Sequence, residues 1–267
     1  MRKVLNTLVI AVVALFAGTT LMAADDAVEI MKKSHLAYYY AADNGVANIT
    51  MTIINKKGKE RLREFVMLRI DLIEGGEQKY YTYFKKPSDV SRLTFMVWKN
   101  PKGNDDRWIY VPAVDLIKRI SADDKNSSFV GSDFTYEDVS GRHWTEDTHT
   151  LVSVTETTGE RATFLISSVP KESYKGFSEK KVWIDKVSYL PLREEYYDSK
   201  GKLLRVFTAD KIETVEGVAT ITQRSMTNEK KKQHTTIVFD NIDYNTGVTD
   251  KIFTERYLKN PPRQYIK

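Results

Sequence analysis

The sequence contains no cysteine and only four histidines among its 267 residues. Without cysteine the chain forms no disulfide, so a hydrophobic core has to hold the fold together. Cysteine nucleophiles and thiolate metal sites are excluded for the same reason. A cysteine that could be lipidated after a leader peptide is also missing, so we expect a soluble protein without that anchor.

Recognisable catalytic motifs are also absent: there is no G-x-S-x-G, H-E-x-x-H or phosphate loop. His143 and His149 stand six residues apart around Glu146 and Asp147, a loose set that could bind a divalent metal. Zinc sites need three or four convergent ligands, and a polar loop is the simpler interpretation. His35 has no partner at helical spacing. We therefore predict no metal and no cofactor.

Acidic residues gather at Asp123-Asp124 and again at Asp133, Glu137 and Asp138. The first pair lacks the alternating ligands and the terminal Glu of a calcium loop. Carboxylate pairs indicate a glycosidase only through their separation in space, which the sequence does not give. No catalytic residue is predicted, and a hydrolase stays a third hypothesis.

The first 24 residues read as a secretory signal. Arg2 and Lys3 precede the apolar run Leu8–Ala17, and small residues follow as far as Ala24. The run is shorter than the roughly 20 residues that span a bilayer. We predict cleavage after Ala23 or Ala24 and a periplasmic location, with an uncleaved anchor as the alternative. Residues 25–267, which contain no linker, are predicted to form one domain.

The charge balance is modest. Cleavage would remove two of the 41 basic residues and leave 39 against 36 acidic ones, a net charge of about +3. A nucleic-acid footprint would need clustered Lys and Arg on one face. Lys230–Lys232 and the tail Arg256–Lys267 are the densest candidates, and a solvated hairpin tip explains the lysines. We predict no nucleic-acid partner.

The chain is expected to begin with a helix and to continue as strands. From Asp25, apolar residues recur at helical spacing until Asn44-Gly45. Apolar residues then alternate with polar ones, and turn residues separate many of the runs. The expected strands are 49–53, 62–68, 79–84, 93–98, 108–111, 116–120, 150–155, 162–166, 181–185, 192–197, 203–211, 219–226 and 235–244.

This meander predicts an antiparallel sheet and a mainly β fold. So many strands exceed what a flat open sheet tolerates, so the sheet should curl strongly. The concave side then has to be filled by side chains and the helix, or by a ligand.

Several segments resemble one family. They are the signal, the amphipathic first helix, the meander, the pair Trp108–Pro112 and Lys118–Ile120, the string FVGSDFTYED at Phe129–Asp138, and FTERYL at Phe253–Leu258. Together they look like the outer membrane lipoprotein-sorting branch of the LolA-like superfamily. The resemblance covers nearly the whole mature chain, and the Phe129–Asp138 string is its specific part.

The resemblance implies a half-open antiparallel β-barrel of about eleven strands, with helices over its concave side and an apolar cavity. Members look like periplasmic carriers that shield acyl chains from water, in association with an inner-membrane permease of the RND/MMPL type. The physical need is plain, because each methylene kept from water is worth roughly 0.8 kcal/mol.

Two departures limit what can be transferred. The best-known carrier of the superfamily is shorter, and the membrane-anchored receptor has an N-terminal cysteine that this chain lacks. We therefore expect a monomeric carrier of lipid or lipoprotein acyl chains. The alternative is a non-transporting interaction protein or an envelope-stress sensor on the same scaffold.

Candidate site residues follow from these expectations. Apolar residues expected near the concave side are candidates for the cavity wall, although ordinary core packing would also explain them; they are Tyr38, Ile49, Met51, Tyr81, Phe95, Trp108, Tyr110, Phe164 and Phe207. The string around Gly131, which permits a sharp turn, is expected to be a lid or partner-docking loop, or else a cap on an open barrel end; its candidates are Phe129, Gly131, Asp133, Phe134, Tyr136, Glu137 and Asp138.

Overall fold

Alternation of apolar and polar residues produces thirteen strands, one for each run expected from the sequence. The computed structural model describes residues 16–266, with side chains from residue 26 onward. The strands are β1 (Asn44–Ile54), β2 (Glu60–Asp71), β3 (Gln78–Lys86), β4 (Thr94–Lys99), β5 (Asp106–Val111), β6 (Leu116–Ile120), β7 (Asp147–Thr158), β8 (Arg161–Pro170), β9 (Glu179–Asp185), β10 (Pro191–Tyr197), β11 (Leu203–Val215), β12 (Val218–Asn228) and β13 (Gln233–Tyr244). The helices are α1 (Phe16–Tyr39), α2 (Tyr136–Ser140) and α3 (Glu255–Lys259).

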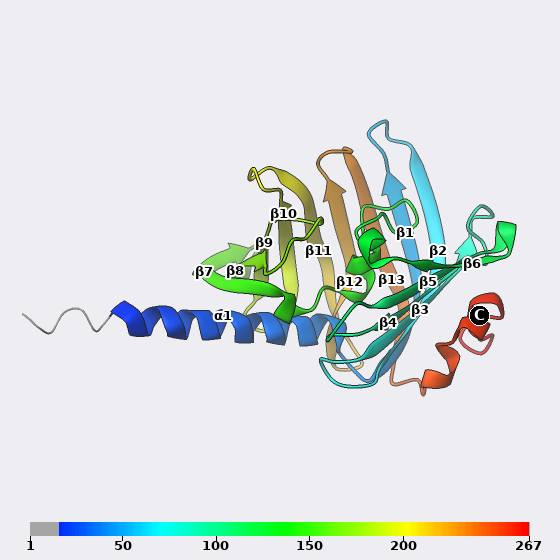
Figure 1. Ribbon diagram of the computed structural model, residues 1–267, viewed down its shortest axis with the longest axis horizontal. Coiled ribbons are helices and arrows are strands. Elements are labelled where there is room, and N and C mark those ends of the chain that lie inside the picture. Colours follow the sequence, from blue (N-terminus) through cyan, green and yellow to red (C-terminus); the bar gives the residue numbers. More distant parts are fainter. Residues whose placement is uncertain (1–15, 267) are drawn as a thin grey trace, which may run out of the picture.

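All thirteen strands belong to one antiparallel sheet, in the order β6-β5-β4-β3-β2-β1-β13-β12-β11-β10-β9-β8-β7 (Figure 1). The sheet curls without closing, so the predicted half-open antiparallel barrel is confirmed. The number of about eleven strands implied by the resemblance is wrong, whereas the thirteen runs seen in the sequence are all present. Curling is expected because a twisted sheet of this width does not stay flat.

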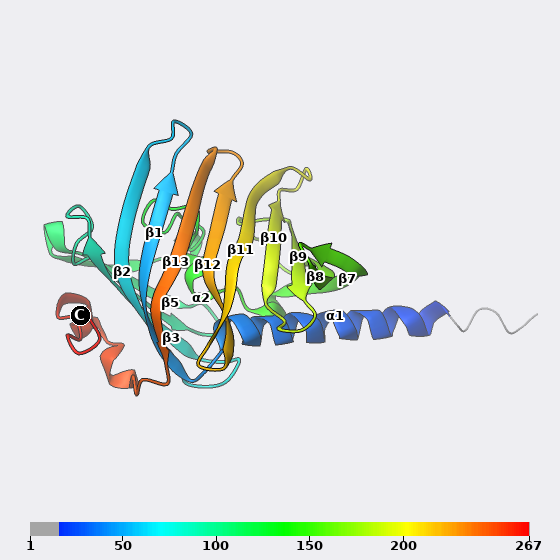
Figure 2. The ribbon, with the colours of Figure 1, turned by 180° about the vertical axis from the view of Figure 1, so that it is seen from behind.

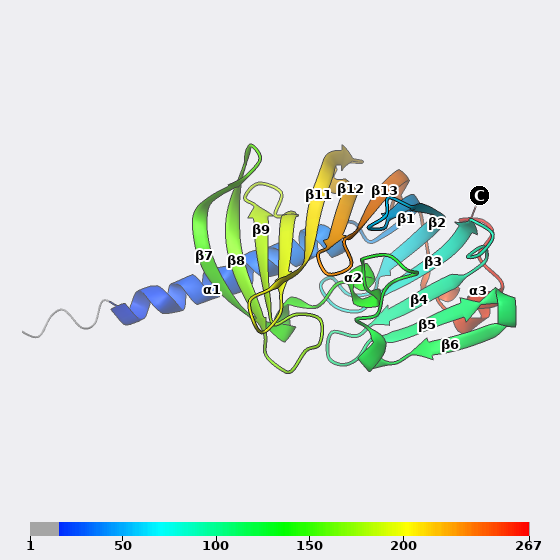
Figure 3. The same cartoon turned by 90° about the horizontal axis from the view of Figure 1, so that it is seen from above.

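The topology follows from a single long-range pairing. Strands β1 to β6 form one half of the sheet and β7 to β13 the other, and each strand pairs with its sequence neighbours within its half. The halves meet where β1 pairs with β13, from Gly45 opposite Tyr244 to Ile54 opposite His234. The connection between β6 and β7, residues 121–146, crosses the concave side, where Figure 3 shows α2 inside the curve.

Helix α1 covers the concave face of the second half. Ala27, Ile30 and Met31 pack against buried residues of β8 and β9, and in Figure 2 the helix runs across the ends of these strands. The helix ends at Tyr39, earlier than the predicted stop at Asn44-Gly45. The predicted signal, residues 1–24, lies mostly outside the described residues; only 16–24 are described, as the beginning of α1. No described helix is long and apolar enough to cross a membrane.

The convex face of the first half is buried as well. The segment after β13, which includes α3, folds back over it (Figure 3). Val248, Ile252, Phe253 and Leu258 form a core cluster with β2–β5 residues. The Trp98 indole donates a hydrogen bond of 2.9 Å to the Phe253 carbonyl. Strands β2–β5 are therefore apolar on both faces.

Truncating Phe253 tests the contribution of this cover. Its side chain is fully buried, and a large-to-small change in such a position costs about 3–5 kcal/mol because a cavity remains. We expect Phe253→Ala to lower the free energy of unfolding by that amount in urea titrations. The exposed Val187→Ala is the control and should change it by less than about 0.5 kcal/mol. An unchanged urea midpoint for Phe253→Ala would show that the C-terminal segment is not part of the core.

Candidate functional site: an apolar cavity in the concave side

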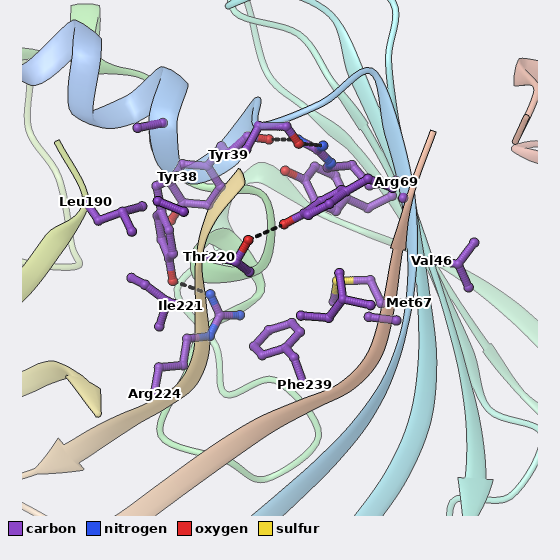
Figure 4. Close-up of a pocket in the computed structure, with 18 of the residues that line it drawn as sticks. Tyr38, Tyr39, Val46, Met67, Arg69, Leu190, Thr220, Ile221, Arg224 and Phe239 are labelled. Atoms are coloured by element: carbon purple, nitrogen blue, oxygen red, sulfur yellow. Dashed lines mark hydrogen bonds between the residues drawn. The ribbon is translucent and has the colours of Figure 1, made fainter. Parts of the chain in front are cut away.

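An apolar cavity lies on the concave side, where the end of α1 meets the ends of β1, β12 and β13 (Figure 4). Its volume is about 130 Å³. It is lined by Ala37, Tyr38, Tyr39, Ala41, Gly45, Val46, Ala47, Met67, Arg69, Tyr80, Val139, Leu190, Ala219, Thr220, Ile221, Arg224, Phe239, Ile242 and Tyr244. An engineered cavity of about 150 Å³ takes up benzene, so this volume has room for a few methylenes and is too small for a whole acyl chain.

The walls are apolar because successive side chains of a strand point to opposite faces. Met67 and Phe239 lie on the cavity side, while the Val46 side chain points away from the cavity (Figure 4) and packs against the cluster on the convex face, although the residue borders the cavity. Near the strand ends the hydroxyls of Thr220 and Tyr244 lie 2.9 Å apart and hydrogen-bond each other. The cavity is thus an apolar pocket with a few polar groups in its wall.

Arg69 fixes the end of α1 at the cavity. Its guanidinium donates to the carbonyls of Tyr39, Ala41 and Ala42, the last at 2.7 Å. The last carbonyls of a helix have no partner within the helix, and a cation near them also suits the helix dipole. The Asp71 carboxylate forms an ion pair with the same guanidinium at 3.5 Å. The helix end is therefore tied to β2.

Arg224 of β12 is the other cation in the wall. It donates a hydrogen bond to the Tyr38 hydroxyl. The guanidinium carbon lies 4.8 Å from the ring centre of Phe239, 5.5 Å from that of Phe134 and 5.6 Å from that of Tyr38. Burial raises the pKa of the Tyr38 phenol, and the opposing effect of Arg224 is smaller. The phenol therefore stays neutral and can accept from the arginine.

The rest of the concave side is filled by residues 128–140, which we call the inner segment. Phe129 packs among Phe65, Phe84 and Phe95 of the first half, with ring centres 6.3, 5.9 and 5.4 Å away. Phe129 and Phe134 are both buried in the main core cluster. Aromatic side chains bury large areas and favour such tilted and edge-on contacts. The inner segment thus occupies the space that a ligand would take in an empty barrel.

Polar contacts hold the inner segment to the strands around it. The Thr235 hydroxyl donates to Asp133 at 2.7 Å, and the Gln233 amide donates to the Gly131 carbonyl at 3.2 Å. Arg61 of β2 donates to the same carbonyl at 3.1 Å. Gly131 has φ of 81°, a conformation that favours glycine. The segment is attached to both halves of the sheet.

A buried ion pair anchors its helix. The Asp138 carboxylate accepts a hydrogen bond from Arg205 of β11 at 2.6 Å. It also accepts one from the backbone amide of Thr135, the residue that caps the N-terminus of α2. Burial alone would raise the pKa of Asp138, but Arg205 and Thr135 outweigh it and the pKa is lowered. The pKa of Asp133 is raised, because the effect of burial is larger than the opposing effect of the hydrogen bonds from Thr235 and Gln233. Asp138 is therefore charged and paired at neutral pH.

The predicted wall residues fall into three groups. Tyr38 lines the cavity, and Ile49, Met51, Phe95 and Phe207 lie on the concave side in the core cluster with the inner segment. Phe164 also faces that side, but it packs beside the α1 contact with β8 and β9. Tyr81, Trp108 and Tyr110 belong instead to the convex cluster under the C-terminal segment, so their prediction as concave residues is wrong.

The predicted lid is placed differently from the expectation. Phe129, Gly131, Asp133, Phe134, Tyr136, Glu137 and Asp138 come together in the inner segment, inside the curve of the sheet and not over an open end. Glu137 pairs with Lys125 at 2.7 Å. Its role as a lid or partner-docking loop stays a prediction.

The histidine cluster is engaged within the protein. His143 contacts Thr145 and the Gly75 carbonyl, and His149 contacts Ser168 and the Trp144 carbonyl. Glu146 and Asp147 both accept from Arg142. Among residues 26–266 no group of three or more His, Asp or Glu could hold a metal ion.

Sequence reasoning missed most of the cavity wall. Arg69, Arg224 and Met67 gave no signal, since each stands in an ordinary alternating strand. Only the pairing of β1 with β13 brings them beside the end of α1.

Comparison with known proteins places this fold in a family. A family model whose description reads "Uncharacterized protein" matches residues 76–260, and the chain belongs to that family. No curated protein matches the sequence.

Solved structures show the same fold. A domain assigned to outer membrane lipoprotein-sorting proteins, from Vibrio parahaemolyticus, has a TM-score of 0.82 at 27% identity, over 88% of this chain and 99% of its own. A DUF1329 family protein from Desulfovibrio piger has 0.80 at 25%, over 90% and 98%. A LolA superfamily protein from Nitrosomonas europaea has 0.67 at 17%, over 86% and 98%. The resemblance to the lipoprotein-sorting branch of the LolA-like superfamily is confirmed.

Asp71 gives the site a pH dependence that can be measured. Burial raises its pKa to about 6, although Arg69 and Gln78 oppose this. The folded protein therefore binds more protons than the unfolded chain, whose Asp titrates near about 3.9. Stability should fall as the pH rises from about 4 to 6 and then level off, by at most about 3 kcal/mol.

Urea unfolding at pH values from 4 to 7 measures this slope. Asp71→Asn keeps the shape and removes the titration, so the difference in stability between wild type and variant should change across that window. A difference that is constant from pH 4 to 7 would contradict the assignment.

Proposed function

We propose that this protein is a periplasmic carrier that binds lipid, or the acyl chains of lipoproteins, on the concave side of its sheet. The observation that carries the proposal is the apolar cavity beside the end of α1, in a fold shared with a lipoprotein-sorting domain. Most ligand sites are concave and mainly apolar with a few placed polar groups. The predicted signal supports the periplasmic location, and we assign no enzymatic activity.

Loading requires the inner segment to leave its place. The present cavity, about 130 Å³, is too small for a full chain. Release of Phe129 and Phe134 would open the aromatic surface of Phe65, Phe84 and Phe95. An acyl chain could then replace their contacts, because burial of each methylene is worth roughly 0.8 kcal/mol. The inner segment would act as an internal stand-in for the ligand.

The direction of transfer belongs to the same proposal. A carrier of this kind would receive its cargo from an inner-membrane permease of the RND/MMPL type and deliver it towards the outer membrane. It would work as a monomer, since each copy shields its own ligand.

A second function is favoured by one observation: the concave side is already largely filled by the protein's own side chains. A non-transporting interaction protein or envelope-stress sensor needs no open cavity, and would use an outer surface. The edge strand β7 carries the exposed residues Val152 and Val154, and β8 carries Val169. An unpaired edge can add a strand from a partner.

Locking the inner segment separates the two functions. Asp133 and Thr235 contact each other through their side chains, so we choose the pair Asp133→Cys and Thr235→Cys for a disulfide, and loss of free thiols on oxidation shows that the bridge has formed. The natural chain has no cysteine, so no other thiol can compete. We expect the reduced form to bind a fluorescent fatty acid and the oxidised form to bind it at least about tenfold more weakly, a loss of about 1.4 kcal/mol.

A second pair is the control for the disulfide itself. Thr208 and Ser225 are directly opposite on β11 and β12, at a spacing that suits a bridge. Thr208→Cys with Ser225→Cys should bind equally when oxidised and reduced. Equal binding by both forms of the Asp133/Thr235 variant would show that the segment does not open. No binding by any form, wild type included, would overturn the carrier and favour the partner-binding protein.

A further inference from the structure

Arg224 is an arginine inside an apolar cavity without an acidic partner. No carboxylate lies within 4.0 Å of its guanidinium nitrogens among the side chains of residues 26–266, and its Nε is buried without a hydrogen-bond partner. Arg224 is partly buried. Arg205, which is also partly buried, pairs with Asp138 at 2.6 Å, and the buried Arg107 pairs with Asp105 at 2.6 Å. A charge that is withdrawn from water ordinarily has such a partner.

Nearby carboxylates are not free to serve it. Two of them influence the Tyr38 phenol that contacts Arg224, namely Asp138 and Glu194. Asp138 is already bound by Arg205. Glu194 is 3.4 Å from Lys180 and also accepts from the Tyr196 hydroxyl. Each of these acids is thus neutralised by another residue.

The contacts that Arg224 makes within the protein do not compensate its charge. One guanidinium nitrogen donates to the neutral Tyr38 hydroxyl, and the aromatic rings around it supply only weak cation–π attraction. A guanidinium has five N–H donors arranged as a planar fork that matches the oxygens of a carboxylate or phosphate. In Figure 4 the side chain lies among the apolar wall residues, facing Tyr38 and Phe239.

We propose that Arg224 is the binding site for the anionic head of the ligand, and that the ligand is an acidic amphiphile whose apolar chain enters the cavity. This rests on the proposed carrier function and narrows its ligand class. The head is a phosphate or a carboxylate; it pairs with Arg224 while the first methylenes lie against Met67, Ile221 and Phe239. A neutral acyl chain would leave the arginine uncompensated, so the site selects for charge.

Binding of three amphiphiles with the same twelve-carbon chain tests the proposal. Dodecanoate and dodecyl phosphate are anionic, and monolauroylglycerol is neutral; each is titrated into the full protein by calorimetry below its micelle concentration. We expect wild type to bind the two anions at least about tenfold more tightly than the neutral lipid, as charge-assisted hydrogen bonds imply. Inorganic phosphate alone should bind far more weakly, which separates a lipid head from a free anion.

Substitution of Arg224 should remove the preference. Arg224→Met keeps the length and loses the charge, so the anions should lose about tenfold in affinity while the neutral lipid is unaffected or gains. Arg224→Lys should retain part of the preference. Arg193→Met is the matched control, because Arg193 pairs with Glu195 on the other face of the sheet, and it should bind as wild type does.

The outcomes distinguish this inference from the carrier function. If wild type binds all three lipids equally, or Arg224→Met keeps the anion preference, the inference is overturned and the carrier stands. If wild type binds none of them, the carrier itself fails. Should Arg224→Met not fold, wild type and Arg224→Lys still decide, since the preference for anions is read within each protein.

Discussion

The pairing of β1 with β13 is the constraint on which the rest of the structure depends. It joins the first strand to the last, and the paired residues Gly45 and Tyr244 stand 199 positions apart in the sequence. The joined sheet is too wide to remain flat, so it curls. A curled antiparallel sheet with an apolar inner face must cover that face, and here the cover comes from α1 and from the connection between the halves.

That connection explains both the stability and the proposed activity. Phe129 and Phe134 fill the concave side as a ligand would, and Asp133 and Asp138 tie them to β13 and β11. Polar ties at the edge and apolar contacts in the middle suit a segment that opens as a unit, because a lipid can replace the apolar contacts while water hydrates the polar groups. The cavity beside α1 is the part that the segment leaves unfilled.

Sequence patterns predicted the strands better than the site. Alternation marks strands, and all thirteen runs appear, because apolar alternation identifies them and turn residues separate several of them. It does not say which face of a strand is concave. On β2–β5 both faces are buried, since α3 and its neighbours cover the outer one; Tyr80 therefore faces the cavity while the adjacent Tyr81 faces Tyr257 and the C-terminal segment. The role of Arg224 could not be predicted from the sequence, because the absence of an acidic partner is apparent only when the neighbouring strands are in place.

The most direct test of the central claim is native mass spectrometry of the protein released gently from the cells that make it, followed by extraction and identification of any lipid. The account predicts a mass increase corresponding to one lipid or acylated molecule per chain, with an acidic head among the extracted species. A clean unliganded mass, together with no uptake of added lipid, would contradict a carrier and indicate that the filled sheet serves as a scaffold for a protein partner.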